Sequence, residues 1–375
     1  MPYLVAPLLL LHTVGARMQK DPAGKGRIES LGPLGLWSLI PLAALILVIH
    51  PITSRAALTA LHFMVGVLLG ALIGVNWRKA GLGKSFISLG LLGFTAITVA
   101  QLALIFLESG SPTAFHSEAV LSWGASNYIA GVLVTAAFVL IGQKPFARLS
   151  VLVGFAALVA ALGTLSRGAI LAVGVAAAAH LWSTGRTPAS RFALRLSCIG
   201  LPVLGLTLLG KVTALRSVGG YDPTQNTDAR FILYRAAWDQ FRTNPIFGTG
   251  WTGLEGALPS QFVTSLAHNI VLSLLQIGGT LGIIMLAILL RLNGAAWRTA
   301  SARGAIAGAA TISMSDPFYE GLVGSMLILA FIVSVTRYPG SPPDANSDPR
   351  TSPASTSLVR NHRQRSGTQS LSANP

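Results

Sequence analysis

Three basic side chains in the middle of the chain could act on an anionic substrate: Arg167, Arg230 and His268. Arg167 lies between two adjacent apolar segments and has no acidic residue near it in the sequence. A guanidinium in that setting suits a phosphate or pyrophosphate, which it can hold through two parallel hydrogen bonds. The alternative is an arginine that extends along apolar surface to reach lipid headgroups. The same two interpretations apply to Arg230, whose charge Asp228 or Asp239 could also neutralise.

His268 begins an apolar segment, where we expect the boundary between membrane and water. An imidazole at such a boundary can be neutral near pH 7 and can accept a proton from a hydroxyl group. The alternative is that His268 is an ordinary polar anchor for the segment that follows it.

Several kinds of chemistry have no basis in the sequence. It contains no H-E-x-x-H motif, no D-x-D pair and only one cysteine, Cys198, so we predict no metal site and no cofactor. It also lacks a Walker A motif and a dinucleotide-binding glycine fingerprint. The net charge of +15 comes from basic residues scattered over short loops and the tail, which argues against a nucleic-acid partner.

The elements that position these residues are predicted to be membrane-spanning helices. The chain is 52% hydrophobic and only 10% charged, whereas soluble domains carry about 25% charged residues. Apolar runs of about 17–25 residues recur along it, long enough to cross ~30 Å of hydrocarbon as helices. The predicted spans are 34–50, 56–76, 84–107, 125–142, 149–165, 168–184, 191–210, 269–291, 303–315 and 321–336, with 2–14 as a short eleventh. The fold class is therefore all-α, a polytopic transmembrane bundle.

The distribution of Lys and Arg predicts the orientation of this bundle. If the C-terminal tail is inside the cell and the spans alternate, most of the 27 Lys and Arg residues fall on the inside. Such a bias is the usual signature of cytoplasmic loops. Arg167, Arg230 and His268 then all lie at the outer surface, in a transmembrane domain of residues 1–337.

The sequence has one long outer loop, at about 211–267, and one polar tail, at 338–375. Asp228 is a plausible N-cap for a helix over 229–243, which would place Arg230, Tyr234, Trp238 and Phe241 on one stripe. Such a helix would lie on the membrane surface or cap the bundle. The tail is rich in Pro, Ser, Asn and Arg, which predicts a disordered cytoplasmic segment whose arginines could contact membrane lipids.

The order of these motifs resembles the O-antigen ligase and polymerase superfamily. The resemblance covers roughly 120–290 and consists of Ser166-Arg167-Gly168-Ala169, then Asp228-Ala229-Arg230 with Trp238 in a long outer loop, then Asn244-Pro245-Ile246-Phe247-Gly248-Thr249-Gly250, then His268-Asn269. Asn127, where a predicted helix starts at the outer surface, is similar to an asparagine often found upstream in that group.

The resemblance implies a GT-C-like multi-helix transferase of the bacterial inner membrane. Such an enzyme takes a glycan from an undecaprenyl-pyrophosphate carrier and passes it to a hydroxyl of a glycan or glycolipid acceptor, without a metal ion and with inversion. Arg167 and Arg230 would hold the pyrophosphate, and His268 would orient or deprotonate the acceptor hydroxyl. Asn269 would hold the helix and the imidazole in place, and it is predicted, with Asn127, to belong to the substrate-binding residues.

Two alternatives remain open at this stage. A polymerase of the same superfamily would use the same chemistry on a different acceptor, and the compact outer loop favours a ligase. A transporter or scaffold in glycan export would not be catalytic. Because the centres of the predicted spans carry no charged residue, an ion-coupled transporter is disfavoured.

Overall fold

The computed structural model describes residues 31–78, 82–111, 114–115, 119–143, 146–182, 223–252, 254, 267–316, 318–319 and 321–336, with short pieces between 187 and 214. The predicted segment 2–14 and the tail 338–375 lie outside the described residues, and the predicted span 191–210 lies largely outside them.

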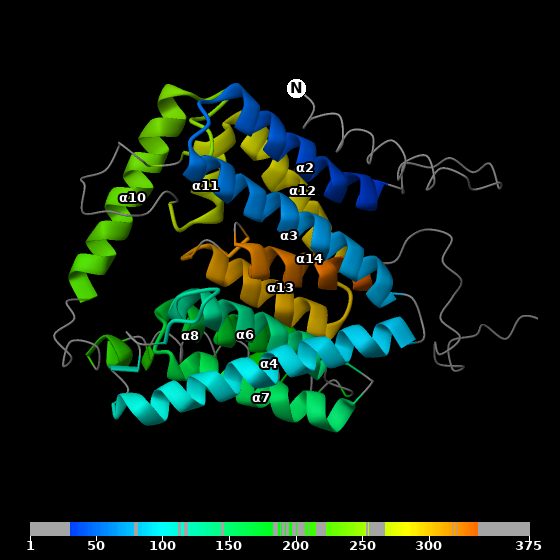
Figure 1. The fold of residues 1–375 in the computed structure, drawn as a ribbon. Coiled ribbons are helices and arrows are strands. Elements are labelled where there is room, and N and C mark those ends of the chain that lie inside the picture. Colours follow the sequence, from blue (N-terminus) through cyan, green and yellow to red (C-terminus); the bar gives the residue numbers. More distant parts are fainter. Residues whose placement is uncertain are drawn as a thin grey trace, which may run out of the picture. The chain divides into compact units, whose positions relative to one another are not determined.

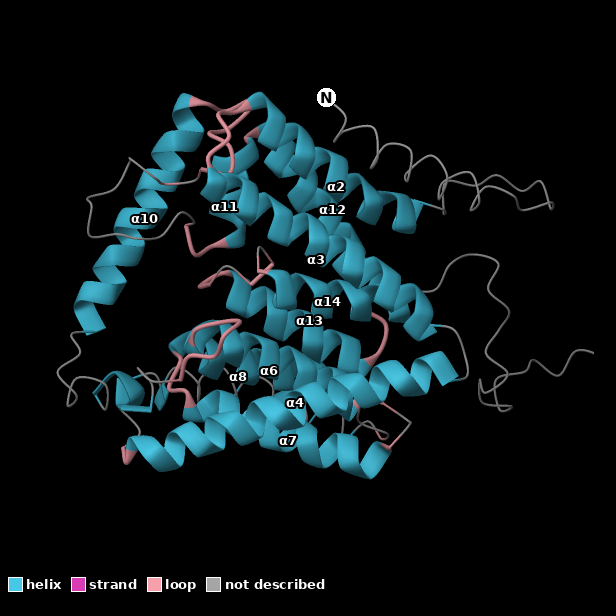
Figure 2. Ribbon diagram, viewed as in Figure 1, coloured by secondary structure: helices cyan, strands magenta, loops and turns pink. Residues whose placement is uncertain are grey.

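Helices make up nearly all of the described residues (Figures 1 and 2). The only other regular feature among those residues is an isolated bridge between Leu121 and Gly124. The helices are α2 (Leu31–Ile49), α3 (Ser54–Arg78), α4 (Leu82–Ser109), α6 (Ser126–Ile141), α7 (Ala147–Gly163), α8 (Arg167–Leu181), α10 (Pro223–Thr243), α11 (Ile270–Gly278), α12 (Thr280–Ala296), α13 (Ala300–Ser313) and α14 (Leu322–Val335). The all-α class is therefore confirmed for the described residues.

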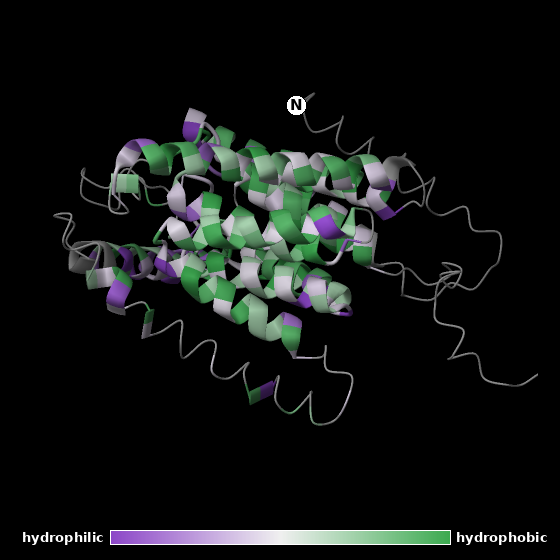
Figure 3. Ribbon diagram, turned by 90° about the horizontal axis from the view of Figure 1, so that it is seen from below, coloured by the Kyte–Doolittle hydropathy of each residue, from purple (hydrophilic) through white to green (hydrophobic). Residues whose placement is uncertain are grey.

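The helices follow the predicted apolar segments closely. Each predicted segment between 34 and 184 coincides with one helix, as do 303–315 and 321–336. By length and composition, α3 and residues Lys84–Ser109 of α4 are long and apolar enough to cross a membrane, and six further described helices are apolar but shorter. Most residues along the helices are hydrophobic, and hydrophilic residues lie mainly toward helix ends (Figure 3).

The predicted single span 269–291 is wrong, because the chain reverses inside it. α11 ends at Gly278, and Gly279 adopts φ +52° and ψ −122°, a conformation open essentially only to glycine. Gly282 of α12 then lies directly against the backbone of Leu274 in α11. In a continuous helix these two residues would be about 12 Å apart. The segment is therefore a helical hairpin with its corner at Gly279.

Replacing Gly279 with alanine is expected to lower the free energy of unfolding by about 1–3 kcal/mol, because the side chain would force a strained backbone. The added Cβ would also lie 2.6 Å from the carbonyl oxygen of Pro245. Thermal unfolding of the purified protein in detergent would measure the loss. Gly294→Ala is the matched control, because nothing lies within 4 Å of its Cβ position in α12. Equal melting temperatures for the two variants would contradict the strained corner.

A second feature is the depth at which the α13–α14 turn lies. α14 packs against α3 in parallel, with Gly66 of α3 beside Ser325 and Gly74 beside Ala330 and Val333. The start of α14 therefore faces the middle of α3, whose first twelve residues extend about 18 Å further. Asp316, Phe318 and Tyr319, which precede α14, are buried within the bundle. Tyr319 is 4% exposed, and its hydroxyl donates to Asn293 Oδ1 of α12 at 3.2 Å. The α13–α14 turn is thus recessed below the end of α3.

Candidate functional site

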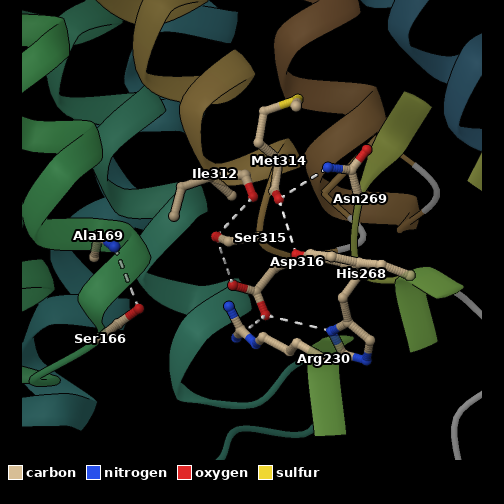
Figure 4. A network of polar contacts seen from close by, with 10 residues as sticks. Ser166, Ala169, Arg230, His268, Asn269, Ile312, Met314, Ser315 and Asp316 are labelled. Atoms are coloured by element: carbon tan, nitrogen blue, oxygen red, sulfur yellow. Dashed lines mark hydrogen bonds and ion pairs between the residues drawn. The ribbon is translucent and has the colours of Figure 1, made fainter. Parts of the chain in front are cut away.

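A buried carboxylate, Asp316, lies in this recessed turn and brings two of the predicted site residues together (Figure 4). Its side chain is 6% exposed. Oδ1 lies 3.7 Å from Nη2 of Arg230 and 3.6 Å from Nδ1 of His268. These three residues come from the α13–α14 turn, from α10 and from the segment before α11. They form the cluster that we call the Asp316 cluster.

The turn itself fixes the carboxylate. α13 ends at Ser313, and the backbone N–H of Asp316 donates to the carbonyl of Ile312 at 2.8 Å. The Ser315 hydroxyl lies 3.1 Å from both that carbonyl and Asp316 Oδ2, so it can donate to either oxygen. Asp316 is therefore held on one side by its own turn and faces cationic groups on the other.

Arg167 begins the helix that packs beside this turn. Ser166 is the N-cap of α8, and its hydroxyl accepts from the N–H of Ala169 at 3.3 Å. The next residue, Gly168, lies so close to the turn that an added Cβ would be 3.6 Å from Asp316 Oδ2 and closer still to the Ser315 hydroxyl. The structure therefore places the Arg167 segment next to the Asp316 cluster.

α10 presents Arg230 and Tyr234 to the same turn. Leu233 and Ala237, on a neighbouring face of α10, are buried in a small apolar cluster with Leu254 and Ala267. All four residues of the predicted stripe lie in α10, and the rings of Trp238 and Phe241 are in contact, 5.4 Å apart, while Trp238 is 45% exposed. The predicted N-cap at Asp228 is wrong, because the helix begins at Pro223.

The ion partner of Arg230 also differs from the alternative considered above. Asp228 and Asp239 lie on the same helix as Arg230, but the carboxylate within ion-pair distance is Asp316, from a distant part of the chain. Sequence analysis missed Asp316 altogether. The available signal was its place in the turn between two apolar segments, which alternation puts on the same side as Arg230 and His268.

Asn269 fixes the start of α11 and, with it, His268. Its side-chain Oδ1 accepts from the N–H groups of Val271 and Leu272, at 3.1 and 3.2 Å. Its Nδ2 donates to the carbonyl of Met314 at 3.3 Å. His268 adopts φ +54°, a left-handed conformation that turns the chain just before the helix. The expectation that Asn269 holds the helix is thus confirmed, whereas its part in substrate binding stays a prediction.

The carbonyl of Met314 also accepts a second hydrogen bond, which the hydroxyl of Tyr234 donates at 3.3 Å. Burial raises the pKa of Tyr234, Arg230 acts in the opposite direction, and Asp316 adds to the rise. The phenol therefore stays protonated and remains a donor at physiological pH. One carbonyl thus joins α10, α11 and the turn that carries Asp316.

Replacing Tyr234 with phenylalanine is expected to lower the free energy of unfolding by about 1 kcal/mol, because the hydrogen bond that ties α10 to the carbonyl of Met314 is lost. Thermal unfolding of the purified protein in detergent would measure the loss. Phe231→Leu is the control, since Phe231 is 66% exposed on α10. An unchanged melting temperature in Tyr234→Phe would show that the hydroxyl does not tie α10 to this turn.

The segment after α10 clamps the corner of the α11–α12 hairpin. The N–H groups of Thr249 and Gly250 donate to the carbonyls of Gln276 and Ile277, at 2.8 and 2.9 Å. The N–H of Thr280 donates back to the carbonyl of Ile246 at 3.0 Å. Gly248 and Gly250 have φ +70° and +80°, so glycine is needed at both positions. This turn therefore fixes the end of α10 relative to α11, and so Arg230 relative to His268.

Asn127 lies in the first turn of α6, a helix that contacts both α13 and α14. The neighbouring Tyr128 hydroxyl accepts from the N–H of Gly324 at 2.6 Å, which ties α6 to the start of α14. The structure thus places Asn127 beside the elements that carry the cluster. Its role toward a substrate stays a prediction.

The electrostatics of the site favour an anion. One buried carboxylate faces Arg230 and His268, with the start of α8 at Arg167 alongside. α8 and α11 both begin here, and helix N-termini carry partial positive charge. Within the described ranges no group of three or more His, Cys, Asp or Glu side chains could hold a metal ion.

Taken together, fold and site define an all-helical protein of apolar helices with a cationic site where several of those helices begin or end. Residues 152–287 match the family model described as O-antigen ligase, and this match supports assigning the chain to the O-antigen ligase superfamily. The matched region contains Arg167, Arg230, His268 and Asn269, whereas Asn127 and Asp316 lie outside it. No curated protein and no solved structure matches the chain.

Proposed function

We propose that this protein is a membrane-integral glycosyltransferase of the O-antigen ligase kind. It moves a glycan from undecaprenyl-pyrophosphate to an acceptor hydroxyl at the outer face of the bacterial inner membrane, with its C-terminus in the cytoplasm. The observation that carries the proposal is the Asp316 cluster, which joins Arg230 and His268 beside the start of α8 within a chain of this superfamily.

The membrane setting is supported by the surfaces of the helices. Large apolar side chains point outward from α4 and α7, for example Leu107 at 76%, Val159 at 68% and Leu152 at 66% exposure. Exposed apolar surface on this scale is costly in water and natural in lipid. The same view accounts for the small number of charged residues along the helices. We therefore assign these surfaces to the bilayer.

In the proposed reaction the anionic carrier is bound by the arginines. Arg167 and Arg230 hold the pyrophosphate and stabilise the negative charge that develops as the bond between the sugar C1 and the phosphate oxygen breaks. His268 accepts the proton of the acceptor hydroxyl, whose oxygen forms the new bond to C1 from the opposite face. Undecaprenyl pyrophosphate leaves with the electron pair of the broken bond. Asp316 holds Arg230 and the imidazole in place through its charge.

We expect transfer to persist in excess EDTA, because the two arginines supply the positive charge that a divalent cation supplies in other transferases. The measurement is the transfer rate of the purified protein before and after chelation and dialysis. Added Mg²⁺ after chelation tests for recovery. Loss of transfer in EDTA with full recovery on adding Mg²⁺ would contradict the metal-independent mechanism.

The acceptor separates a ligase from a polymerase, which share this chemistry. A ligase uses a sugar of a lipid-anchored core, and a polymerase uses the next lipid-linked repeat. The compact outer loop favours the ligase. Cells without the gene would then accumulate long carrier-linked chains, whereas loss of a polymerase would leave single repeats on the acceptor.

A gel of surface glycans tests the function directly. Cells without the gene are complemented with the wild type or with His268→Ala, and membrane insertion of both proteins is checked by immunoblot. We expect only the wild type to restore the glycan pattern. Unchanged glycans in the deletion strain, or full complementation by His268→Ala, would reject the transferase. Uptake that depends on an ion gradient would then favour a transporter.

A further inference from the structure

α11 carries two polar side chains inside the bundle that the proposed chemistry does not use. Ser273 and Gln276 are both 0% exposed. The hydroxyl of Ser273 and both the oxygen and the nitrogen of the Gln276 amide lack a hydrogen-bond partner. Burying such groups without partners costs about 1–3 kcal/mol each, so native proteins rarely retain them without a reason.

Ser273 and Gln276 lie on the same face of α11 as Asn269, the residue that follows His268. Asn269, Ser273 and Gln276 are spaced by four and three residues and therefore lie on one face of α11. Asn269 directs this face toward the turn that carries Asp316, through its bond to Met314. Leu272 packs to one side against the α10 cluster, and Leu274 packs against Gly282 of α12. A polar strip thus runs up α11 between two apolar contacts.

We propose that this face of α11 binds hydroxyl groups of the acceptor glycan, a proposal that rests on the glycosyltransferase function given above. A glycan hydroxyl both donates and accepts, as does the serine hydroxyl, and an amide offers one acceptor and two donors to neighbouring hydroxyls. The three orphan atoms match that chemistry. A lipid chain or a phosphate would leave the amide oxygen or the hydroxyl unsatisfied.

The position along the helix identifies which part of the acceptor would bind. Gln276 is eight residues beyond His268, which corresponds to about 12 Å along a helix axis. A sugar whose hydroxyl is at His268 therefore cannot itself reach Gln276. The strip contacts sugar units further from the reacting hydroxyl. It determines which acceptor is used, while the groups proposed to bind the carrier come from α8 and α10.

The acceptor reaches the strip when α11 shifts. α11 is nine residues long and lies between two left-handed residues, His268 and Gly279, with φ values of +54° and +52°. Because the strip is buried, the proposal includes a movement of α11 that breaks the bond from Asn269 to Met314 and the bonds from Thr249 and Gly250 to the end of α11. In the structure described here the strip is closed, and binding of the acceptor opens it.

Transfer kinetics separate acceptor binding from the carrier chemistry. The full-length protein is reconstituted in lipid vesicles and supplied with carrier-linked glycan and acceptor glycolipid, both isolated from cells that lack the gene. In Gln276→Leu and Ser273→Ala we expect the KM for the acceptor glycolipid to rise about tenfold, since a lost hydrogen bond of ~1.4 kcal/mol is a factor of ten. The KM for the carrier and kcat should stay within about twofold.

Matched controls separate the effect of the strip on the acceptor KM from the effect of changing a buried hydroxyl in general. Ser273→Thr retains the hydroxyl and should retain the acceptor KM. Thr135→Val removes another fully buried hydroxyl, one that donates to Gly131 of its own helix, and should leave the acceptor KM unchanged. If Gln276→Leu does not fold, Ser273→Ala compared with Ser273→Thr decides the question.

Trapped water is the competing occupant, because water also satisfies buried polar groups. In that case Gln276→Leu and Ser273→Ala would leave the acceptor KM unchanged, and Gln276→Leu would melt at a higher temperature than the wild type. That result would overturn the acceptor strip and leave the transferase intact. If His268→Ala instead transfers like the wild type in the same assay, it is the proposed function that fails.

Discussion

His268→Ala is expected to lower kcat for glycan transfer by about 10²–10⁴-fold, the usual contribution of a positioned general base. The KM for the carrier-linked glycan should change little, because we propose that arginines from α8 and α10, and not His268, hold the pyrophosphate. The imidazole is well placed for this role: its side chain is 29% exposed, and Nδ1 is oriented toward Asp316.

Chemical rescue distinguishes a lost base from a damaged fold. Because the site of the missing ring is partly open to solvent, added imidazole should restore a measurable part of the activity of His268→Ala. His62→Ala, on the exposed surface of α3, is the control and should transfer normally without imidazole. Activity close to that of the wild type in His268→Ala, or a defect that imidazole leaves untouched while the protein remains folded, would remove His268 from the chemistry.

The sequence predicted most helices because apolar runs of sufficient length have few other options in lipid. It failed at 269–291, where glycine in an apolar run is compatible with a continuous helix. The reversal at Gly279 depends on bonds from a different segment, notably from Ile246, Thr249 and Gly250 to the hairpin corner. Such long-range backbone bonds have no local signature. The predicted start of α10 was wrong for a simpler reason. Pro223 is well suited to the first helical turn, whereas the prediction took Asp228 as the N-cap.

The basic residues of the site could be predicted from the sequence. Arg230 and His268 stood out because charged or titratable groups beside apolar segments are uncommon. Asp316 did not, because a single aspartate before a proline in a short turn is usually an exposed residue. Its burial follows from the register of α3 on α14, in which Gly66 and Gly74 allow close contact and place the turn halfway down α3. Register of that kind is a property of the packed bundle.

Asp316→Asn is expected to lower kcat/KM by about 10²-fold while the protein still folds and inserts. The amide keeps the shape of the carboxylate but removes the negative charge that lies 3.7 Å from Arg230 and 3.6 Å from His268. Breaking a buried pair from one side typically costs about 3–5 kcal/mol, and part of that is recovered here because Arg230 is 23% exposed. The remaining positive groups would repel one another and lose their common anchor.

A double-mutant cycle tests whether the charge of Asp316 acts through Arg230. The transition-state free energies of wild type, Asp316→Asn, Arg230→Gln and the double variant are compared through kcat/KM. If the carboxylate positions Arg230, the double variant should be little worse than Arg230→Gln alone. Asp239→Asn, an exposed carboxylate on α10, is the control for a general change of charge and should be silent. Strictly additive losses would mean that Asp316 acts independently of Arg230, and the ion pair would then be a structural contact rather than part of the site.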